Sequence, residues 1–237
     1  MKALVTGGSA GIGLEVVKRL LERDYEVVSV DVQPAGHKHP KLEHVEVDLT
    51  NTLATERFAE KIKNQDITTV VHNAGAIRPA LLPEVKIEDF AALVNLHLTA
   101  AVLLVQATLP AMKAAKYGRV VFVSSRAVLG LPTRTSYSAT KAGMLGMART
   151  WALELAPHGV TVNVVAPGPI RTANFHGIVP EGSPQVQKIA DAIPLKRLGE
   201  VDDVARAVLF FAERDAGFVT GQVLYVCGGT SVGTLTL

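Results

Sequence analysis

A tyrosine and a lysine stand four residues apart in the segment Tyr137-Ser138-Ala139-Thr140-Lys141. This spacing places both side chains on one face of a helix. A free phenol titrates near about pH 10, and an adjacent ammonium group favours the phenolate and so lowers the phenol pKa. The pair therefore predicts acid–base chemistry, with Tyr137 transferring a proton and Lys141 tuning it, but so short a pattern also arises by chance.

Two further polar groups precede this pair in the chain. Ser124-Ser125 ends an apolar run, where a hydroxyl group could hold a substrate oxygen beside Tyr137. Asn95 lies in a long apolar helical stretch, and a buried amide there needs a hydrogen-bond partner. Asn95 either holds a water molecule that relays protons to Lys141 or is a satisfied core amide, and its spacing alone does not separate these roles.

A glycine-rich segment, Thr6–Gly13, follows the first predicted strand and opens the first predicted helix. Glycines at this point let the backbone turn tightly and approach a pyrophosphate, which the positive end of the helix stabilises. A purely structural turn would look similar, but the position after the first strand favours a dinucleotide site.

Acidic and small residues follow the next three strands. Asp31 ends the second, where a carboxylate accepts hydrogen bonds from a ribose diol and repels a 2′-phosphate, so NAD is predicted rather than NADP. Asp48 follows the third strand and either contacts the adenine or caps the next helix. Asn73-Ala74-Gly75 ends the fourth, where small residues permit close approach to a ribose and Asn73 can tie neighbouring strands together.

The elements that must position these groups alternate between strands and helices. The predicted strands are Ala3–Val5, Glu26–Val30, Val45–Val47, Thr68–Val71, Arg119–Val123, Val160–Val165 and Val223–Val226. The predicted helices are Ile12–Arg23, Leu53–Lys63, Ile87–Ala115, Ser136–Ala156 and Val201–Glu213. This order predicts an α/β fold, a single doubly wound parallel sheet of the Rossmann type with helices on both faces. Residues 1–237 are expected to form one domain, and 173–194, with only a short helical piece, a substrate loop.

Composition restricts the partners. The net charge is +2 and the cations are scattered, which argues against nucleic acid. Phe90–Met112 carries no charge and is long enough to span a membrane, but its polar residues favour a buried soluble helix. A single cysteine, Cys227, fits a cytoplasmic location. His37 and His39 have no acidic or cysteine partner nearby, so no metal site is predicted.

Taken together, these motifs resemble the short-chain dehydrogenase/reductase family in its compact form, and the resemblance covers nearly the whole chain. It implies a catalytic tetrad of Asn95, Ser125, Tyr137 and Lys141. It also implies contacts to the nicotinamide from the segment after the sixth strand. The cofactor-binding residues expected on these grounds are Gly7, Ser9, Gly11, Ile12, Gly13, Asp31, Asp48, Leu49, Asn73, Ala74, Gly75, Tyr137, Lys141, Pro167, Gly168, Ile170 and Thr172.

The sequence departs from the family pattern at three places. His72 replaces the first of two asparagines before Ala74-Gly75, and Cys227 replaces the aspartate before the closing glycine pair. The family interval between serine and tyrosine would select Ser124, whereas the family preference for the last serine of the pair selects Ser125. Ser125 is the residue predicted here.

The predicted function is reversible hydride transfer between NAD and a small-molecule secondary alcohol or ketone, that is, oxidation of CH–OH groups. A sugar-nucleotide epimerase or dehydratase and a non-catalytic NAD-sensing protein are the alternatives. The former usually carries an extra substrate domain, and the latter tends to lose the tyrosine or the lysine. By the same resemblance, the long apolar helices predict a homo-oligomer, a tetramer with a dimer as the alternative.

Overall fold

A computed structural model describes residues 1–232, and its seven strands form one parallel sheet in the order β3-β2-β1-β4-β5-β6-β7. The chain order reverses between β1 and β4, and there the carboxyl ends of neighbouring strands diverge. The strands are β1 Lys2–Thr6, β2 Glu26–Asp31, β3 Leu42–Glu46, β4 Ile67–His72, β5 Gly118–Val123, β6 Val160–Pro167 and β7 Val223–Val226.

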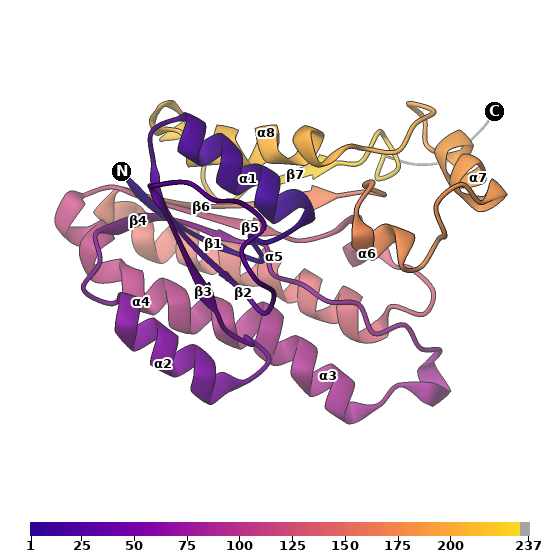
Figure 1. Cartoon of the computed structure of the whole chain (residues 1–237), viewed down its shortest axis with the longest axis horizontal. Helices are drawn as coiled ribbons and strands as arrows, with labels where there is room; N and C mark the ends of the chain where they lie inside the picture. The colour runs from indigo at the N-terminus through magenta and orange to yellow at the C-terminus, as the bar shows by residue number, and fades with distance from the viewer. Residues whose placement is uncertain (233–237) are drawn as a thin grey trace.

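Helices cover both faces of this sheet (Figure 1). On one face α1 lies beside α8, and on the other face lie α2, α4 and α5. The main helices are α1 Gly11–Glu22, α2 Thr52–Ile62, α3 Ile87–Val94, α4 Ala100–Ala115, α5 Thr135–Leu155 and α8 Val201–Ala212. This arrangement confirms the predicted doubly wound α/β fold.

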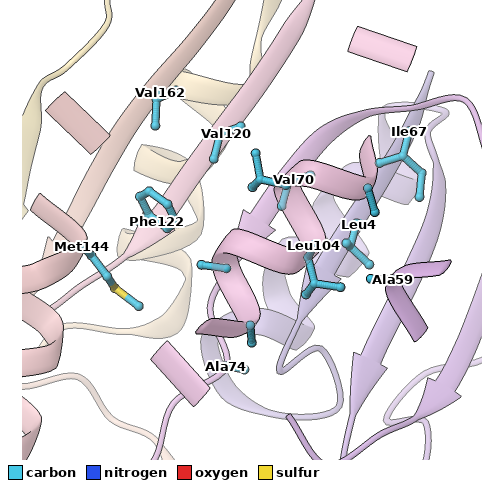
Figure 2. Packing of buried hydrophobic residues seen from close by; sticks show 14 of the residues in the cluster. Leu4, Ala59, Ile67, Val70, Ala74, Leu104, Val120, Phe122, Met144 and Val162 are labelled. Carbon is cyan, nitrogen blue, oxygen red and sulfur yellow. The ribbon is translucent and has the colours of Figure 1, made fainter. Parts of the chain in front are cut away.

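The sheet buries apolar side chains on both faces because successive side chains of a strand point in opposite directions. Leu4 belongs to the core beneath α2, α4 and α5, whereas its neighbours Ala3 and Val5 belong to the core beneath α1 and α8. Figure 2 shows part of the first core, where Phe122 of β5 and Met144 of α5 lie in the same cluster. These two cores fix the strand ends, and the strand ends carry the predicted site residues.

α1 and α8, which lie side by side, are joined by an ion pair as well as by apolar packing. Arg19 of α1 donates a 2.6 Å hydrogen bond to the carboxylate of Asp202 on α8. Arg19 also pairs with Glu15 one turn earlier in its own helix. The first and last helices of the chain therefore form one layer.

Three predicted elements differ from the observed ones in kind or by more than two residues at an end. β3 begins at Leu42, before the predicted Val45. The sequence pattern missed this start because the edge strand is only partly buried and lacks a continuous apolar run. The predicted helix Ile87–Ala115 is interrupted by a π-helical turn at Asn95–Thr99. The 173–194 segment contains two helices, α6 Ala173–His176 and α7 Pro184–Ala192, instead of one short piece.

The helical run Ile87–Ala115 is long and apolar enough by composition to cross a membrane. In the fold it packs against β4, α2 and α5, so part of its apolar surface is covered by protein. A single such run is weak evidence for a membrane span, because core helices of soluble proteins have the same composition.

Candidate active site

A cavity of about 800 Å³ opens at the carboxyl ends of the strands, around the point where the strand order reverses. Most of the residues predicted to bind cofactor or to act in catalysis line it. They are Gly7, Gly11, Ile12, Asp31, Asp48, Leu49, Asn73, Ala74, Gly75, Ser125, Tyr137, Lys141, Pro167, Gly168, Ile170 and Thr172. Three predicted residues, Ser9, Gly13 and Asn95, are not among the residues that line it.

The glycine-rich segment turns sharply because one of its glycines adopts a conformation that side chains disfavour and another has no room for a side chain. Gly7 has a φ of +67°, in the left-handed region. A Cβ atom on Gly13 would lie 1.9 Å from the backbone oxygen of Gly7, so the helix could not pack this closely with any other residue. Gly13 therefore shapes the turn from behind the cavity.

The N-terminus of α1 faces this turn with free donors. Its N-cap residue, Ala10, has no side chain that accepts a hydrogen bond from the first helical turn. The backbone N–H groups of that turn therefore remain available to an anion, which the helix dipole also favours. The close turn and the open helix end fit the pyrophosphate of a dinucleotide.

Asp31 lies at the end of β2, beside the glycine-rich segment. Its carboxylate accepts hydrogen bonds from the backbone N–H groups of Ser9 at 3.0 Å and of Gln33 at 3.1 Å. The Ser9 hydroxyl donates to the backbone oxygen of Gln33 at 3.0 Å, so Ser9 supports the loop from outside the cavity. Each oxygen of Asp31 keeps a lone pair that a ribose hydroxyl can use.

The next two strand ends carry the remaining groups of this half of the cavity. The Asp48 carboxylate accepts from both the backbone N–H and the hydroxyl of Thr50, whereas Asn51, not Asp48, caps α2. Asn73 donates its amide hydrogens to the backbone oxygens of Thr6 and Gly7, at 3.2 and 3.0 Å. Asn73 thus ties the end of β4 to the end of β1, as the sequence predicted.

Tyr137 and Lys141 project from the first two turns of α5 into the same cavity. The Lys141 Nζ atom lies 5.8 Å from the centre of the Tyr137 ring and donates a 2.8 Å hydrogen bond to the backbone oxygen of Val123. Burial lowers the pKa of Lys141 to about 7. Burial also raises the pKa of Tyr137, and this effect exceeds the opposing effects of Ser125 and Arg134.

The two adjacent serines have different surroundings. The Ser124 hydroxyl donates a 2.8 Å hydrogen bond to the backbone oxygen of Lys141 and is 3% exposed. The Ser125 hydroxyl accepts from the backbone N–H of Ala127 at 3.1 Å and lowers the pKa of Tyr137, which places it beside the phenol. The Ser125 hydroxyl still has a proton to donate to a substrate oxygen.

Asn95 begins the π-helical turn between α3 and α4. Its side-chain amide donates a 3.1 Å hydrogen bond to the backbone oxygen of Thr50, in the loop that follows β3. Asn95 thereby connects this helical run to the Asp48 loop. The amide N–H therefore has a protein partner, and a role in a proton relay stays a prediction.

The segment after β6 forms the far wall of the cavity. The backbone N–H of Gly168 donates to the backbone oxygen of Val226 at 2.9 Å, and a Cβ atom on Gly168 would lie 2.8 Å from Cys227. Thr172 caps α6 by accepting from the N–H of Phe175. A Cβ atom on Gly11 would lie 3.5 Å from the Thr172 side chain, so this wall closes against the glycine-rich segment.

The outer part of the cavity adds residues beyond the predicted cofactor-binding and catalytic set, several of them from the predicted substrate loop 173–194. Cations line its outer part, and of these Arg78 pairs with Asp89 while Arg126 and Arg134 bond to backbone oxygens. The apolar lining there includes Ile77, Leu131, Phe175, Ile178, Val179 and Ile189. His97 lies behind the lining, with its ring centre 5.8 Å from that of Tyr137. Its only signal in the sequence is that it is a histidine in a charge-free helix.

The chain was compared with protein-family models and with curated relatives. Residues 7–231 match the family model described as enoyl-(acyl carrier protein) reductase. The (2S)-[(R)-hydroxy(phenyl)methyl]succinyl-CoA dehydrogenase subunit BbsD of Thauera aromatica is 37% identical, with 97% of this chain and 96% of that protein covered. The 3-oxoacyl-[acyl-carrier-protein] reductase FabG of Haemophilus influenzae is 36% identical, with 96% of each covered.

The chain was also compared with solved structures. An oxidoreductase of the short-chain dehydrogenase/reductase family from Burkholderia thailandensis superimposes with a TM-score of 0.90 at 31% identity, covering 98% of this chain and 93% of that one. The family match, the relatives of nearly equal length and the shared fold agree with one another. The chain therefore belongs to the short-chain dehydrogenase/reductase family of oxidoreductases.

Proposed function

We propose that this protein transfers hydride between NAD and a secondary alcohol or ketone, with Tyr137 as the general acid and base. The observation that carries the proposal is the shared cavity. One continuous surface joins the glycine-rich segment and Asp31 to Ser125, Tyr137 and Lys141. A dinucleotide bound along the first part would present its nicotinamide to the second.

Each residue of the second part has a distinct task. The Ser125 hydroxyl donates a hydrogen bond to the substrate oxygen and fixes it beside the Tyr137 phenol. Tyr137 takes the alcohol proton in the oxidation and returns it in the reduction. Lys141 stabilises the phenolate by its charge and orients the nicotinamide ribose. When bound, the nicotinamide supplies the hydride acceptor or donor.

NAD is the proposed cofactor because of the charges at the adenosine end. Asp31 lines the cavity there, followed by Val32 and Gln33, which carry no charge. Among the described residues, the cations that line the cavity are Arg78, Arg126, Arg134 and Lys141, none of which lies on β2 or the loop after it. A 2′-phosphate would therefore meet a carboxylate without a compensating cation.

For the substrate, we propose 3-hydroxyacyl and 3-oxoacyl thioesters as the first class to test. The outer part of the cavity combines apolar side chains, which suit an acyl chain, with Arg126 and Arg134, which suit an anionic carrier. The names of both relatives describe enzymes acting on thioester-linked acyl groups. Short secondary alcohols and hydroxy acids form the comparison panel.

The proposed assembly is a homo-tetramer in the cytoplasm, with a dimer as the alternative. Large apolar side chains are exposed on two helices, Leu153 on α5 at 80% and Phe210 on α8 at 47%. A partner subunit that covers them would remove apolar surface from water. Multi-angle light scattering measures the mass directly, and a stable monomer would refute the assembly.

The deciding experiment measures NADH formation by the purified protein and by Tyr137→Phe. The wild type should form NADH on at least one member of the panel, and the variant should lose turnover but keep its affinity for NADH. Substantial turnover by Tyr137→Phe would refute the role of the tyrosine. An epimerase would show no net NADH formation, and a sensor protein would bind NADH without turnover.

A further inference from the structure

The imidazole of His97 is fully buried, at 0% exposure, in the π-helical turn that faces α5. Its Nδ1 atom lies 2.8 Å from the hydroxyl oxygen of Thr140, the residue directly before Lys141. Its Nε2 atom has no hydrogen-bond partner among the described residues. A buried polar atom without a partner is rare in folded proteins and calls for an explanation.

The hydrogen bonds around Thr140 determine which nitrogen of His97 carries the proton. The Thr140 hydroxyl has one hydrogen, which it donates to the backbone oxygen of Ser136 at 2.9 Å. Towards His97 it therefore acts as an acceptor, so Nδ1 carries the proton and Nε2 carries a lone pair. The opposite tautomer would bury an unpaired N–H donor at Nε2.

That lone pair lies close to the Lys141 ammonium group. A Cβ atom built on Gly75 would lie 3.2 Å from His97 Nε2 and 3.3 Å from Lys141 Nζ, so both atoms border the same small space above Gly75. Only a glycine leaves this space open. One water molecule placed between the two nitrogens can accept from the ammonium and donate to Nε2.

Burial keeps His97 neutral, which the arrangement requires. Burial, and then the positive charge of Lys141, hold the pKa of His97 far below its usual range. The other titratable groups near Lys141 are Tyr137 on the same helix and His72 at the end of β4, whose pKa burial and Lys141 lower to about 3. Among residues 1–232, the acids lining the cavity are Asp31 and Asp48, which follow other strands.

We propose that His97 is a positioning residue of the active site, whose Nε2 atom accepts a hydrogen bond from the Lys141 ammonium through one bridging water molecule. This contact holds the lysine charge in place beside Tyr137. It supplies the ammonium with an acceptor in addition to the backbone oxygen of Val123. The inference rests on the proposed role of Tyr137 and Lys141.

Two substitutions test the contacts of the two imidazole nitrogens separately. His97→Asn keeps an amide near the position of Nδ1, where it can still bond Thr140, but removes the group that faces Lys141. His97→Gln extends an amide to the position of Nε2 and so restores an acceptor there. His158→Asn, in the 3₁₀ turn Ala156–His158 that follows α5, is the matched control for loss of a histidine.

The first readout is the ionisation of Tyr137, followed by the ultraviolet absorption of tyrosinate without any turnover. The same titration is carried out on each variant with Tyr137→Phe added, and the difference between the two curves isolates this tyrosine from the other three. His97→Asn should raise the apparent pKa of Tyr137 by about half a unit to one unit, because the phenolate and the ammonium titrate as a coupled pair, and loss of the acceptor at Nε2 disfavours the charged lysine that stabilises the phenolate. His97→Gln and His158→Asn should leave the pKa close to the wild-type value.

The second readout is the pH dependence of kcat in alcohol oxidation, measured with the Kd for NADH and the Tm of each variant. The acidic limb of the profile, where Tyr137 must lose its proton to act as the base, should move to higher pH by the same amount in His97→Asn, with the Kd for NADH within about twofold of wild type. If the Tyr137 titration and the kcat profile of His97→Asn both match the wild type, His97 only fills space and the proposal is wrong. Failure of the proposed function would instead appear as turnover in Tyr137→Phe.

Discussion

The Ser124 hydroxyl donates a 2.8 Å hydrogen bond to the backbone oxygen of Lys141, which joins the end of β5 to the second turn of α5. The neighbouring Ser125 points to Tyr137 instead. The two adjacent serines thus divide the work: one fixes the helix that carries the catalytic pair, and the other is free to contact substrate.

Substitution of each serine should therefore have a different consequence. Ser125→Ala should lower kcat by about 10²-fold or more with little change in stability, because it removes a donor to the substrate oxygen. Ser124→Ala should lower the free energy of unfolding by about 1–2 kcal/mol, because it removes a buried hydrogen bond between β5 and α5. Steady-state kinetics and urea unfolding of both variants check this, and the reverse assignment would show the opposite pattern.

Asp31 should control the choice between NAD and NADP. Asp31→Asn keeps the shape of the side chain but removes its charge. The ratio of kcat/KM for NADP to kcat/KM for NAD should therefore rise by about tenfold or more. Asp48→Asn, which changes the same charge at the next strand end, should leave the ratio nearly unchanged. A wild-type enzyme that already prefers NADP would contradict the proposed cofactor.

The low pKa of Lys141 should make stability depend on pH. In the folded protein its pKa is about 7, against 10.5 for an unperturbed lysine. Between these values the unfolded chain binds one more proton than the folded chain, so the free energy of unfolding should rise with pH. Below pH 7 both states are protonated and this gain is absent.

Comparison of the wild type with Lys141→Met isolates this effect from other groups. The difference in free energy of unfolding, wild type minus variant, should increase by a few kcal/mol between about pH 7 and pH 9.5. Urea denaturation without cofactor at the two pH values measures it. A difference that stays constant with pH would mean that Lys141 titrates normally.

Phe122 should be essential to the core beneath α5. It is fully buried, its ring centre lies 5.5 Å from that of Trp151, and its edge packs against His72. Phe122→Ala should lower the free energy of unfolding by about 3–5 kcal/mol, whereas Leu53→Ala, 64% exposed on α2, should change it by less than about 0.5 kcal/mol. Chemical denaturation monitored by circular dichroism checks both values.

Much of this architecture follows from the sequence because the parallel sheet is buried on both faces. Several of its strands are near-continuous apolar runs, and the observed bounds of β7 are the predicted ones, Val223–Val226. The loop residues at the strand ends could be predicted as a group because a parallel sheet brings its carboxyl ends together. Asp31, Asn73 and Ser125 all reach the cavity for this reason.

The remaining differences concern features that periodicity does not encode. A π-helical turn adds a residue to one turn of the helix, so the direction in which Asn95 and His97 project cannot be inferred from a regular helical repeat. The choice between Ser124 and Ser125 depends on the orientation of two neighbouring side chains after the end of a strand. The start of β3 depends on its backbone pairing with β2, because its side chains are only partly buried.

The layer formed by α1 and α8 also bears on how the chain folds during synthesis. α1 is made early, whereas the carboxylate of α8 that pairs with Arg19 follows that residue by 183 positions in the chain. Until α8 is made, the apolar side chains of β5 and β6 on that face lack their cover. A chain that stops before α8 should therefore leave this side of its core uncovered and be prone to aggregation rather than form a shorter enzyme.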